Sequence, residues 1–274
     1  MTRTQRRLRE HYGPWAVVTG ASDGIGRELA RCLAEARINV LIVARRHAAL
    51  AALATELRAA ADVEVRVLAA DLSRSDGIQA VLAGTRDLDV GVLVAAAGFG
   101  TSGAFAELPV AEELAMIDVN CRAVVELSHA FAERFVARGR GGIVLMSSLL
   151  AFQGVPRAAT YAATKAFVQT FAEGLRRELA PRGVDVIASA PGPIHSGFAA
   201  RAHMTMAFAQ TPTAVAAATL RALGRRTTVR PGWLSKLLEV SLAILPRWGR
   251  VRVMQLVMGS MTRHALPVTT QRDP

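Results

Sequence analysis

Residues 16–26 read AVVTGASDGIG, a short apolar run followed by a glycine-rich turn, and a helical pattern begins directly after them. Glycines let a backbone turn tightly and approach a pyrophosphate, whose charge is favoured by the exposed amides and dipole at a helix start. A plain strand-to-helix turn is the alternative, but this position after the first strand favours dinucleotide binding. The predicted contacts are Gly20, Ser22, Asp23, Gly24, Ile25 and Gly26.

The rest of the chain repeats this strand-then-helix pattern. Apolar runs that are typical of strands buried on both faces occur at 16–18, 40–43, 63–68, 92–94, 143–146 and 184–188, with another strand-like run at 227–230. Helices are expected at 25–36, 47–60, 75–84, 110–137 and 159–180. The alternation predicts an α/β fold: a single-domain, Rossmann-like, doubly wound parallel sheet of about seven strands with a C-terminal helical extension.

Length and composition fit one domain. With 274 residues and 51% hydrophobic content, the chain can bury a full core. We expect a basic N-terminal arm at 1–13, one Rossmann-fold domain at 14–230 and an amphipathic, basic extension at 231–274. Cys32 and Cys121 show no metal-ligand spacing, so we predict reduced thiols and no metal site.

The formal net charge of +11 raises the question of an anionic partner. The arginines are spread along the chain and aromatic content is only 5%, which argues against nucleic-acid binding. The N-terminal residues lack the apolar core of a signal peptide, and the apolar run 237–245 is far shorter than the roughly 20 residues of a membrane span. We expect a cytoplasmic protein, with peripheral contact at the inner membrane face as a further option.

Tyr161 and Lys165 are four positions apart in a helical pattern, so the phenol and the ammonium share one helix face. A neighbouring cation favours the phenolate, and the phenol could then exchange a proton near neutral pH. The pair is therefore a candidate for general acid–base chemistry. Two surface residues that happen to share a face are the alternative.

The end of the second strand indicates which dinucleotide is bound. NAD-binding sites usually place an acid there to bind the ribose hydroxyls, whereas arginine suits a 2′-phosphate. Ala44 stands where the acid is expected, and Arg45 and Arg46 follow it. The sequence favours NADP(H) over NAD(H), unless the arginines simply end the strand in solvent.

Three motifs together resemble the short-chain dehydrogenase/reductase family over residues 14 to 200: Gly20-x3-Gly24-Ile25-Gly26, Tyr161-x3-Lys165, and Ser148 thirteen residues before the tyrosine. The resemblance implies that Ser148 binds the substrate carbonyl and that Tyr161 passes the proton. It also implies that Lys165 lowers the pKa of the tyrosine and holds the nicotinamide ribose. Asn120 matches the family's fourth catalytic position, which keeps a water beside the lysine.

The same resemblance implies further cofactor contacts, namely Asp71 toward the adenine and Gly98, Pro191, Gly192 and Ser196, the last toward the carboxamide. One departure concerns Ala95 and Ala96, which replace asparagines that brace the adenosine side in the family. Weaker cofactor binding or a less rigid loop would follow, without loss of a proton-transfer group.

Substrate contacts are expected from a lid at about 198–212, where Met204, Met206 and Phe208 either line an apolar pocket or pack on the core. The extension at 231–274 resembles the branch of the family that reduces β-ketoacyl, mycolate and steroid substrates. Its basic and apolar residues suit a membrane surface, a dimer contact or a cover over the active site.

The expected activity is NADPH-dependent reduction of a ketone, or the reverse oxidation of a secondary alcohol, on a hydrophobic acyl or steroid-like substrate. Two alternatives remain: an oxidative alcohol dehydrogenase for small substrates, and a non-catalytic dinucleotide-binding protein at a membrane surface. The family resemblance also implies a homodimer or homotetramer.

Overall fold

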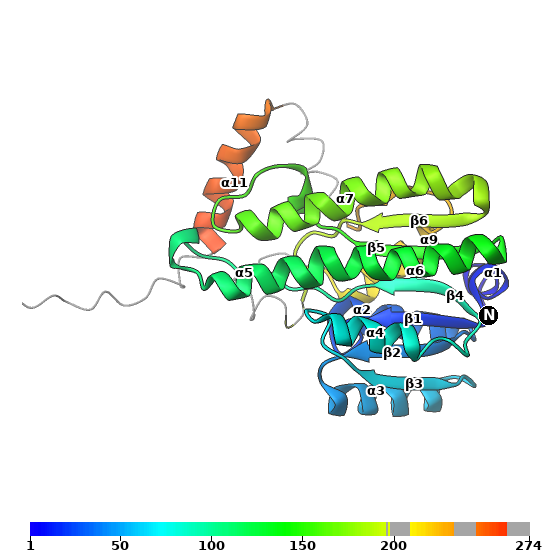
Figure 1. Cartoon of the computed structure of the whole chain (residues 1–274). Coiled ribbons are helices and arrows are strands. Elements are labelled where there is room, and N and C mark those ends of the chain that lie inside the picture. Colours follow the sequence, from blue (N-terminus) through cyan, green and yellow to red (C-terminus); the bar gives the residue numbers. More distant parts are fainter. Residues whose placement is uncertain (196, 198–208, 233–244, 262–274) are drawn as a thin grey trace, which may run out of the picture.

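A computed structural model describes residues 1–195, 197, 209–232 and 245–261 of the chain (Figure 1). Its strands are β1 (Trp15–Thr19), β2 (Asn39–Ala44), β3 (Val65–Ala69), β4 (Val90–Ala95), β5 (Gly141–Met146), β6 (Val184–Ser189) and β7 (Thr228–Val229). All pair in parallel, in the order β3-β2-β1-β4-β5-β6-β7. The predicted doubly wound sheet is confirmed.

The α-helices of the described residues are α1 (Arg3–Tyr12), α2 (Gly24–Glu35), α3 (His47–Ala60), α4 (Ser75–Ala83), α5 (Val110–Ile117), α6 (Ala123–Arg138), α7 (Ala159–Leu179), α9 (Pro212–Ala222) and α11 (Arg247–Met261). Short 3-10 turns are η1 (Phe105–Glu107), η3 (Leu149–Phe152) and η4 (Ala180–Arg182), and η2 (Asp118–Arg122) is a π-helix. No helix among these residues is long and apolar enough to cross a bilayer.

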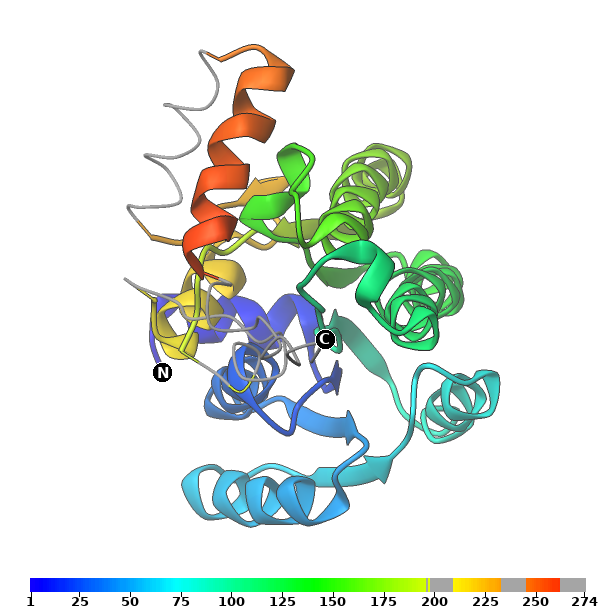
Figure 2. The same ribbon diagram turned by 90° about the vertical axis from the view of Figure 1, so that its left-hand side faces the viewer.

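Helices cover both faces of the sheet, so the fold has three layers, with the sheet in the middle (Figure 2). One apolar cluster joins α1, α2, α3 and α9 to one face, and a second joins α4, α6 and α7 to the other. Within β1, Ala16 and Val18 belong to the first cluster and Trp15 and Val17 to the second, because successive side chains of a strand point to opposite faces. This two-sided burial explains why the strands appear in the sequence as continuous apolar runs.

The order of the strands reverses at β1, which pairs with β2 on one side and β4 on the other. Helices leave toward opposite faces at such a switch point, and ligands of doubly wound folds bind beyond the carboxyl ends of the strands there, which in this chain are β1 and β4. Thr19 ties these ends together, because its hydroxyl donates to the Val94 carbonyl at 3.4 Å and accepts from the Ala97 amide at 3.1 Å.

The expectation of one uninterrupted α-helix over 110–137 is wrong. The helix is broken into α5, the π-helix η2 and α6. Single π turns are characteristic of functional sites, where an inserted residue reorients a side chain. Here the π turn contains Asn120, which is buried and hydrogen-bonded to the loop after β4.

The basic residues at 1–13 form α1, which begins with a capping box between Thr2 and Gln5. Arg7 donates to the carbonyls of Leu223 (2.8 Å) and Leu220 (2.9 Å). The Tyr12 hydroxyl donates to Asp185 on β6 at 2.7 Å. These contacts hold α1 against the domain at the amino end of the sheet.

Candidate active site

Tyr161 and Lys165 lie one turn apart on α7 and are both buried, with 8% and 6% of their surfaces exposed. The Lys165 amine lies 5.7 Å from the centroid of the Tyr161 ring. It donates a hydrogen bond to the Met146 carbonyl, the last residue of β5, at 2.9 Å. The helix thus places both groups at the carboxyl edge of the sheet, where a dinucleotide site is expected.

Burial dominates the proton affinities of this pair. It raises the pKa of Tyr161 to about 12 because the phenolate loses solvation, while a hydrogen bond from the Ser148 side chain acts in the opposite direction. Burial also lowers the pKa of Lys165 to about 8, and the nearby Cys121 opposes that change. The expected lowering of the pKa of Tyr161 by Lys165 is not seen: burial raises this pKa, and the effect that opposes burial comes from Ser148.

Two adjacent serines follow β5 and have different partners. The Ser148 oxygen accepts from the Leu150 amide at 3.2 Å as the first residue before η3, and its side chain is hydrogen-bonded to Tyr161. Ser147 instead donates to the Lys165 carbonyl at 3.2 Å, which braces α7 against β5. The structure brings Ser148, rather than Ser147, to the tyrosine hydroxyl.

Asn120 connects α7 to the loop after β4. Its amide donates to the Phe99 carbonyl (2.9 Å) and to the Thr164 hydroxyl (3.0 Å), and its oxygen accepts from the Phe99 amide at 3.2 Å. Thr164 in turn donates to the Tyr161 carbonyl at 2.8 Å. A Cβ at Gly98 would lie 3.0 Å from the Asn120 oxygen and 3.3 Å from the Lys165 amine, so the loop passes close to both side chains.

Thr164 and the Met146 carbonyl also belong to this site, although the sequence motifs did not indicate them. Thr164 stands three residues after the tyrosine, and a polar residue on the same helix face as Tyr161 could have indicated it. The carbonyl could not have been identified, because only the packing of α7 against β5 brings it to the lysine.

The glycine-rich turn has the geometry that its residues predict. Gly20 and Gly24 have φ values of +68° and +56°, which favour glycine. A Cβ at Gly20 would lie 2.7 Å from the Ala96 carbonyl oxygen, and one at Gly26 would collide with the Gly20 carbonyl. Asp23 caps α2 by accepting from the Gly24 amide at 2.7 Å. Gly20 and Gly26 therefore have to be glycines, because neighbouring backbone leaves no space for a side chain at either position.

The two arginines after β2 are both exposed and lie on the adenosine side expected for the dinucleotide. Arg46 donates to the carbonyl and hydroxyl oxygens of Ser22 at 3.3 and 3.2 Å. The charge of Arg45 acts on Asp71, whose pKa is lowered overall. Desolvation raises the pKa of Asp71, but hydrogen bonds from Ser73 and the charges of the two arginines Arg45 and Arg74 have a larger, opposite effect. The structure thus brings the arginines close to two of the predicted cofactor contacts.

Further predicted contacts lie in the loop after β6. The Pro191 carbonyl accepts from the Leu149 amide at 2.9 Å, which joins the turn containing Gly192 to η3. Asp23 also accepts from the Gly197 amide at 3.1 Å. Ser196 and most of the expected lid, 198–208, lie outside the described residues. Where Ala95 and Ala96 replace asparagines, the Thr19 hydroxyl supplies a tie between β1 and the loop after β4.

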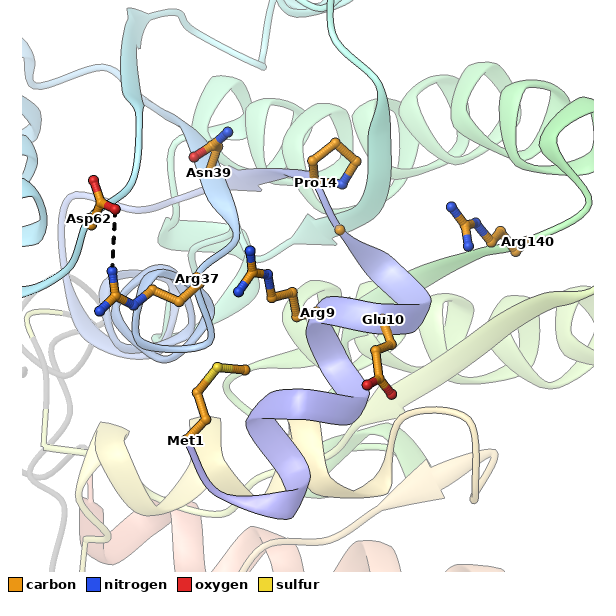
Figure 3. Close-up of a pocket in the computed structure, with 9 residues that line it drawn as sticks. Met1, Arg9, Glu10, Pro14, Arg37, Asn39, Asp62 and Arg140 are labelled. Atoms are coloured by element: carbon orange, nitrogen blue, oxygen red, sulfur yellow. Dashed lines mark ion pairs between the residues drawn. The ribbon is translucent and has the colours of Figure 1, made fainter.

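A hollow of about 640 Å³ lies at the opposite end of the sheet from Tyr161 (Figure 3). It is lined by Met1, Arg9, Glu10, Gly13, Pro14, Arg37, Asn39, Asp62 and Arg140. Arg37 pairs with Asp62 at 3.6 Å, and both side chains are largely exposed. Pro14 and Asn39 stand at the amino ends of β1 and β2, so this hollow is separate from the site around Tyr161.

Comparisons with known proteins agree with this geometry. A 7beta-hydroxysteroid dehydrogenase of Clostridium sardiniense is 36% identical over 185 residues, covering 68% of this chain and 71% of the relative. A very-long-chain 3-oxoacyl-CoA reductase of Podospora anserina is 38% identical over 182 residues, or 64% of this chain and about half (53%) of the relative. Inactive hydroxysteroid dehydrogenase-like protein 1 of Mus musculus is 32% identical over 268 residues, or 94% of this chain and 80% of the relative.

Among solved structures, a short-chain dehydrogenase from Sphingobium yanoikuyae in complex with NADPH superposes with a TM-score of 0.77 and 30% identity. The match covers 94% of this chain and 99% of that one. The family model described as short chain dehydrogenase matches residues 14–207. The sheet has the predicted strand order, and steroid and ketoacyl enzymes are among the relatives. Together with the family match, these findings show that the chain belongs to the short-chain dehydrogenase family.

Proposed function

We propose that the protein reduces a bulky, apolar ketone with NADPH, or carries out the reverse oxidation of a secondary alcohol. The observation that carries the proposal is the buried network of Tyr161, Ser148, Lys165 and Asn120 at the carboxyl edge of the sheet. A carbonyl oxygen that gains negative charge needs donors that are already in place. The hydroxyl groups of Tyr161 and Ser148 are joined by a hydrogen bond, and both can donate to the same substrate carbonyl oxygen.

Bound NADPH would supply the hydride. Tyr161 would give its hydroxyl proton to the substrate oxygen, and its high pKa in this buried site keeps that proton available at neutral pH. Lys165, whose pKa is about 8, would remain mostly protonated at pH 7 and stabilise the phenolate that forms. Asn120 and the Met146 carbonyl hold the position of α7 and of the amine. In oxidation, the same groups would work in reverse.

The fit of a dinucleotide rests on the glycine-rich turn, where Gly20 and Gly24 have positive φ, and on the capped start of α2 that follows it. Arg45 and Arg46 support a 2′-phosphate, since no acid ends β2 and both guanidinium groups lie beside the predicted adenosine contacts. The similarity to a protein solved with NADPH supports the same choice.

Ala44→Asp tests the cofactor preference. The new carboxylate would repel a 2′-phosphate and could accept hydrogen bonds from a free ribose, so we expect the Kd for NADPH to rise about a hundredfold. The Kd for NADH should fall. Isothermal titration with both dinucleotides measures this, and Ala52→Asp, exposed on α3, is the charge-matched control. An unchanged ratio of the two Kd values would contradict the assignment.

The class of substrate follows from the surroundings of the tyrosine and from the relatives. Tyr161 belongs to an apolar cluster, which suits a substrate with little polarity near its ketone. The named relatives include a hydroxysteroid dehydrogenase and a 3-oxoacyl-CoA reductase. We expect NADPH oxidation to be at least tenfold faster, as kcat/KM, with a ketosteroid or a long-chain 3-oxoacyl thioester than with a four-carbon diketone. Equal values for all three would overturn the substrate class.

A dinucleotide-binding protein without turnover remains the second candidate, because a relative that covers 94% of this chain is named inactive. It predicts tight NADPH binding and no oxidation with any ketone of the panel. The presence of Ser148, Tyr161, Lys165 and Asn120 in one hydrogen-bonded site favours catalysis. Apolar side chains exposed on α5 and α7, among them Leu114 and Phe167, support the proposed homo-oligomer.

A further inference from the structure

A third apolar cluster contains both the proposed catalytic tyrosine and residues of the C-terminal helix α11. Its buried members are Phe99, Met116, Val155, Ala158, Tyr161, Ala162, Met254 and Met258. The other two clusters lie between the sheet and its helices, whereas this one lies around the start of α7, at the carboxyl edge of the sheet. Met254 and Met258 come from α11, which Figures 1 and 2 show beside η3 and the first turns of α7.

The two faces of α11 differ in their surroundings. Val251, Met254 and Met258 follow helical spacing, and the two methionines are only 6% and 1% exposed. A Cβ at Gly154, just after η3, would lie 3.5 Å from a methyl group of Val251. On the opposite face, Leu256 is 77% exposed, and Trp248 in the first turn of the helix is 70% exposed. The methionine face is therefore turned toward the catalytic cluster.

This packing also limits access to the reacting groups. Tyr161 and Ser148 are only 8% and 7% exposed, so an apolar substrate must displace some of the side chains around them before its carbonyl reaches both hydroxyls. Methionine is suited to such a change, because its unbranched side chain adapts to differently shaped apolar groups.

We propose that Met254 and Met258 form an adaptable wall of the substrate pocket and determine how large an apolar ketone can reach Tyr161. The inference rests on the proposed function and assigns to α11 a role in substrate selection. A shorter side chain at 254 or 258 enlarges the pocket, and a rigid aromatic one narrows it.

The test compares kcat/KM for a 7-ketosteroid and for cyclohexanone in the full-length protein with NADPH. We expect Met254→Ala and Met258→Ala to raise the steroid-to-cyclohexanone ratio about tenfold, and Met254→Phe to lower it by a similar factor. Leu256→Ala, on the exposed face of α11, is the control and should leave the ratio within twofold. Met254→Leu keeps the volume and checks that folding tolerates changes at this position.

Equal losses on both ketones in all Met254 and Met258 variants, or an equal change in Leu256→Ala, would overturn the inference. A second measurement does not depend on turnover: equilibrium dialysis of the 7-ketosteroid against the NADP+-loaded protein. Met254→Phe should weaken steroid binding about tenfold without changing the Kd for NADP+. If no ketone is turned over, the proposed function fails while this measurement still decides the role of α11. Wild-type protein that does not bind the steroid would also contradict that role.

Discussion

Tyr161→Phe is expected to lower kcat for ketone reduction about a thousandfold while the Kd for NADPH changes less than threefold. The substitution removes only the hydroxyl that we propose as the proton donor to the substrate oxygen, and general acid catalysis contributes roughly 10²- to 10⁴-fold. The ring remains in the apolar cluster with Phe99 and Met116, so the fold should be retained. Steady-state NADPH oxidation and dinucleotide titration measure the two quantities.

The chain offers a matched control, because it contains only two tyrosines. Tyr12 is also buried, but it lies at the amino end of the sheet, where its hydroxyl donates to Asp185 at 2.7 Å. Tyr12→Phe should leave kcat unchanged and reduce the free energy of unfolding by about 1–3 kcal/mol, because a buried hydrogen bond to a charged group is lost. Substantial activity in Tyr161→Phe would refute the role of its hydroxyl.

Lys165→Met is expected to abolish most of the activity, by a hundredfold or more, and to stabilise the cofactor-free protein at pH 7. The lysine is buried, and its pKa is lowered from 10.5 to about 8, so holding the charge in the fold has a penalty on the order of 3 kcal/mol. The lost hydrogen bond to the Met146 carbonyl offsets about 1 kcal/mol of the gain. Chemical denaturation should show a net increase of about 2 kcal/mol.

The pH dependence of the free energy of unfolding separates this charge effect from an effect of packing. Below pH 8 the lysine is protonated in both the folded and the unfolded chain, so the full penalty is present. Between pH 8 and 10.5 the folded chain releases its proton first, and the wild-type protein recovers stability as the pH rises. Lys165→Met lacks that recovery, so the difference in free energy of unfolding between the variant and the wild type should be smaller at pH 10 than at pH 7. Tyr12 and Cys32, whose pKa values are raised by burial, titrate in both proteins and cancel in the comparison.

If the difference in free energy of unfolding between Lys165→Met and the wild type stays constant from pH 7 to pH 10, burial of the charged amine does not destabilise the fold. The prediction would also be wrong if the variant were less stable at pH 7. Either result would remove the physical basis for a lysine held in the site for function at the expense of stability.

The layout of the sheet was predictable because each strand is buried on both faces and so forms a continuous apolar run, as in β4 and β5. The break at η2 was not predictable from these patterns. Residues 110–137 keep a helical pattern throughout, and what distinguishes η2 is the contact of Asn120 with the backbone of Phe99 and with Thr164. Those partners are 21 and 44 residues away in the chain, beyond the reach of any local pattern.

By itself, the sequence determined the chemistry that the protein can attempt: a tyrosine and a lysine one helical turn apart, and glycines where the backbone must take positive φ or approach another segment closely. These are local properties, since helix spacing and backbone sterics act over a few residues. Only the tertiary structure decided that burial would raise the pKa of Tyr161 and lower that of Lys165, and that methionines of α11 would join the apolar cluster that contains the tyrosine. Desolvation depends on everything that surrounds a group, and the cluster that contains Tyr161 includes residues almost a hundred positions further along the chain.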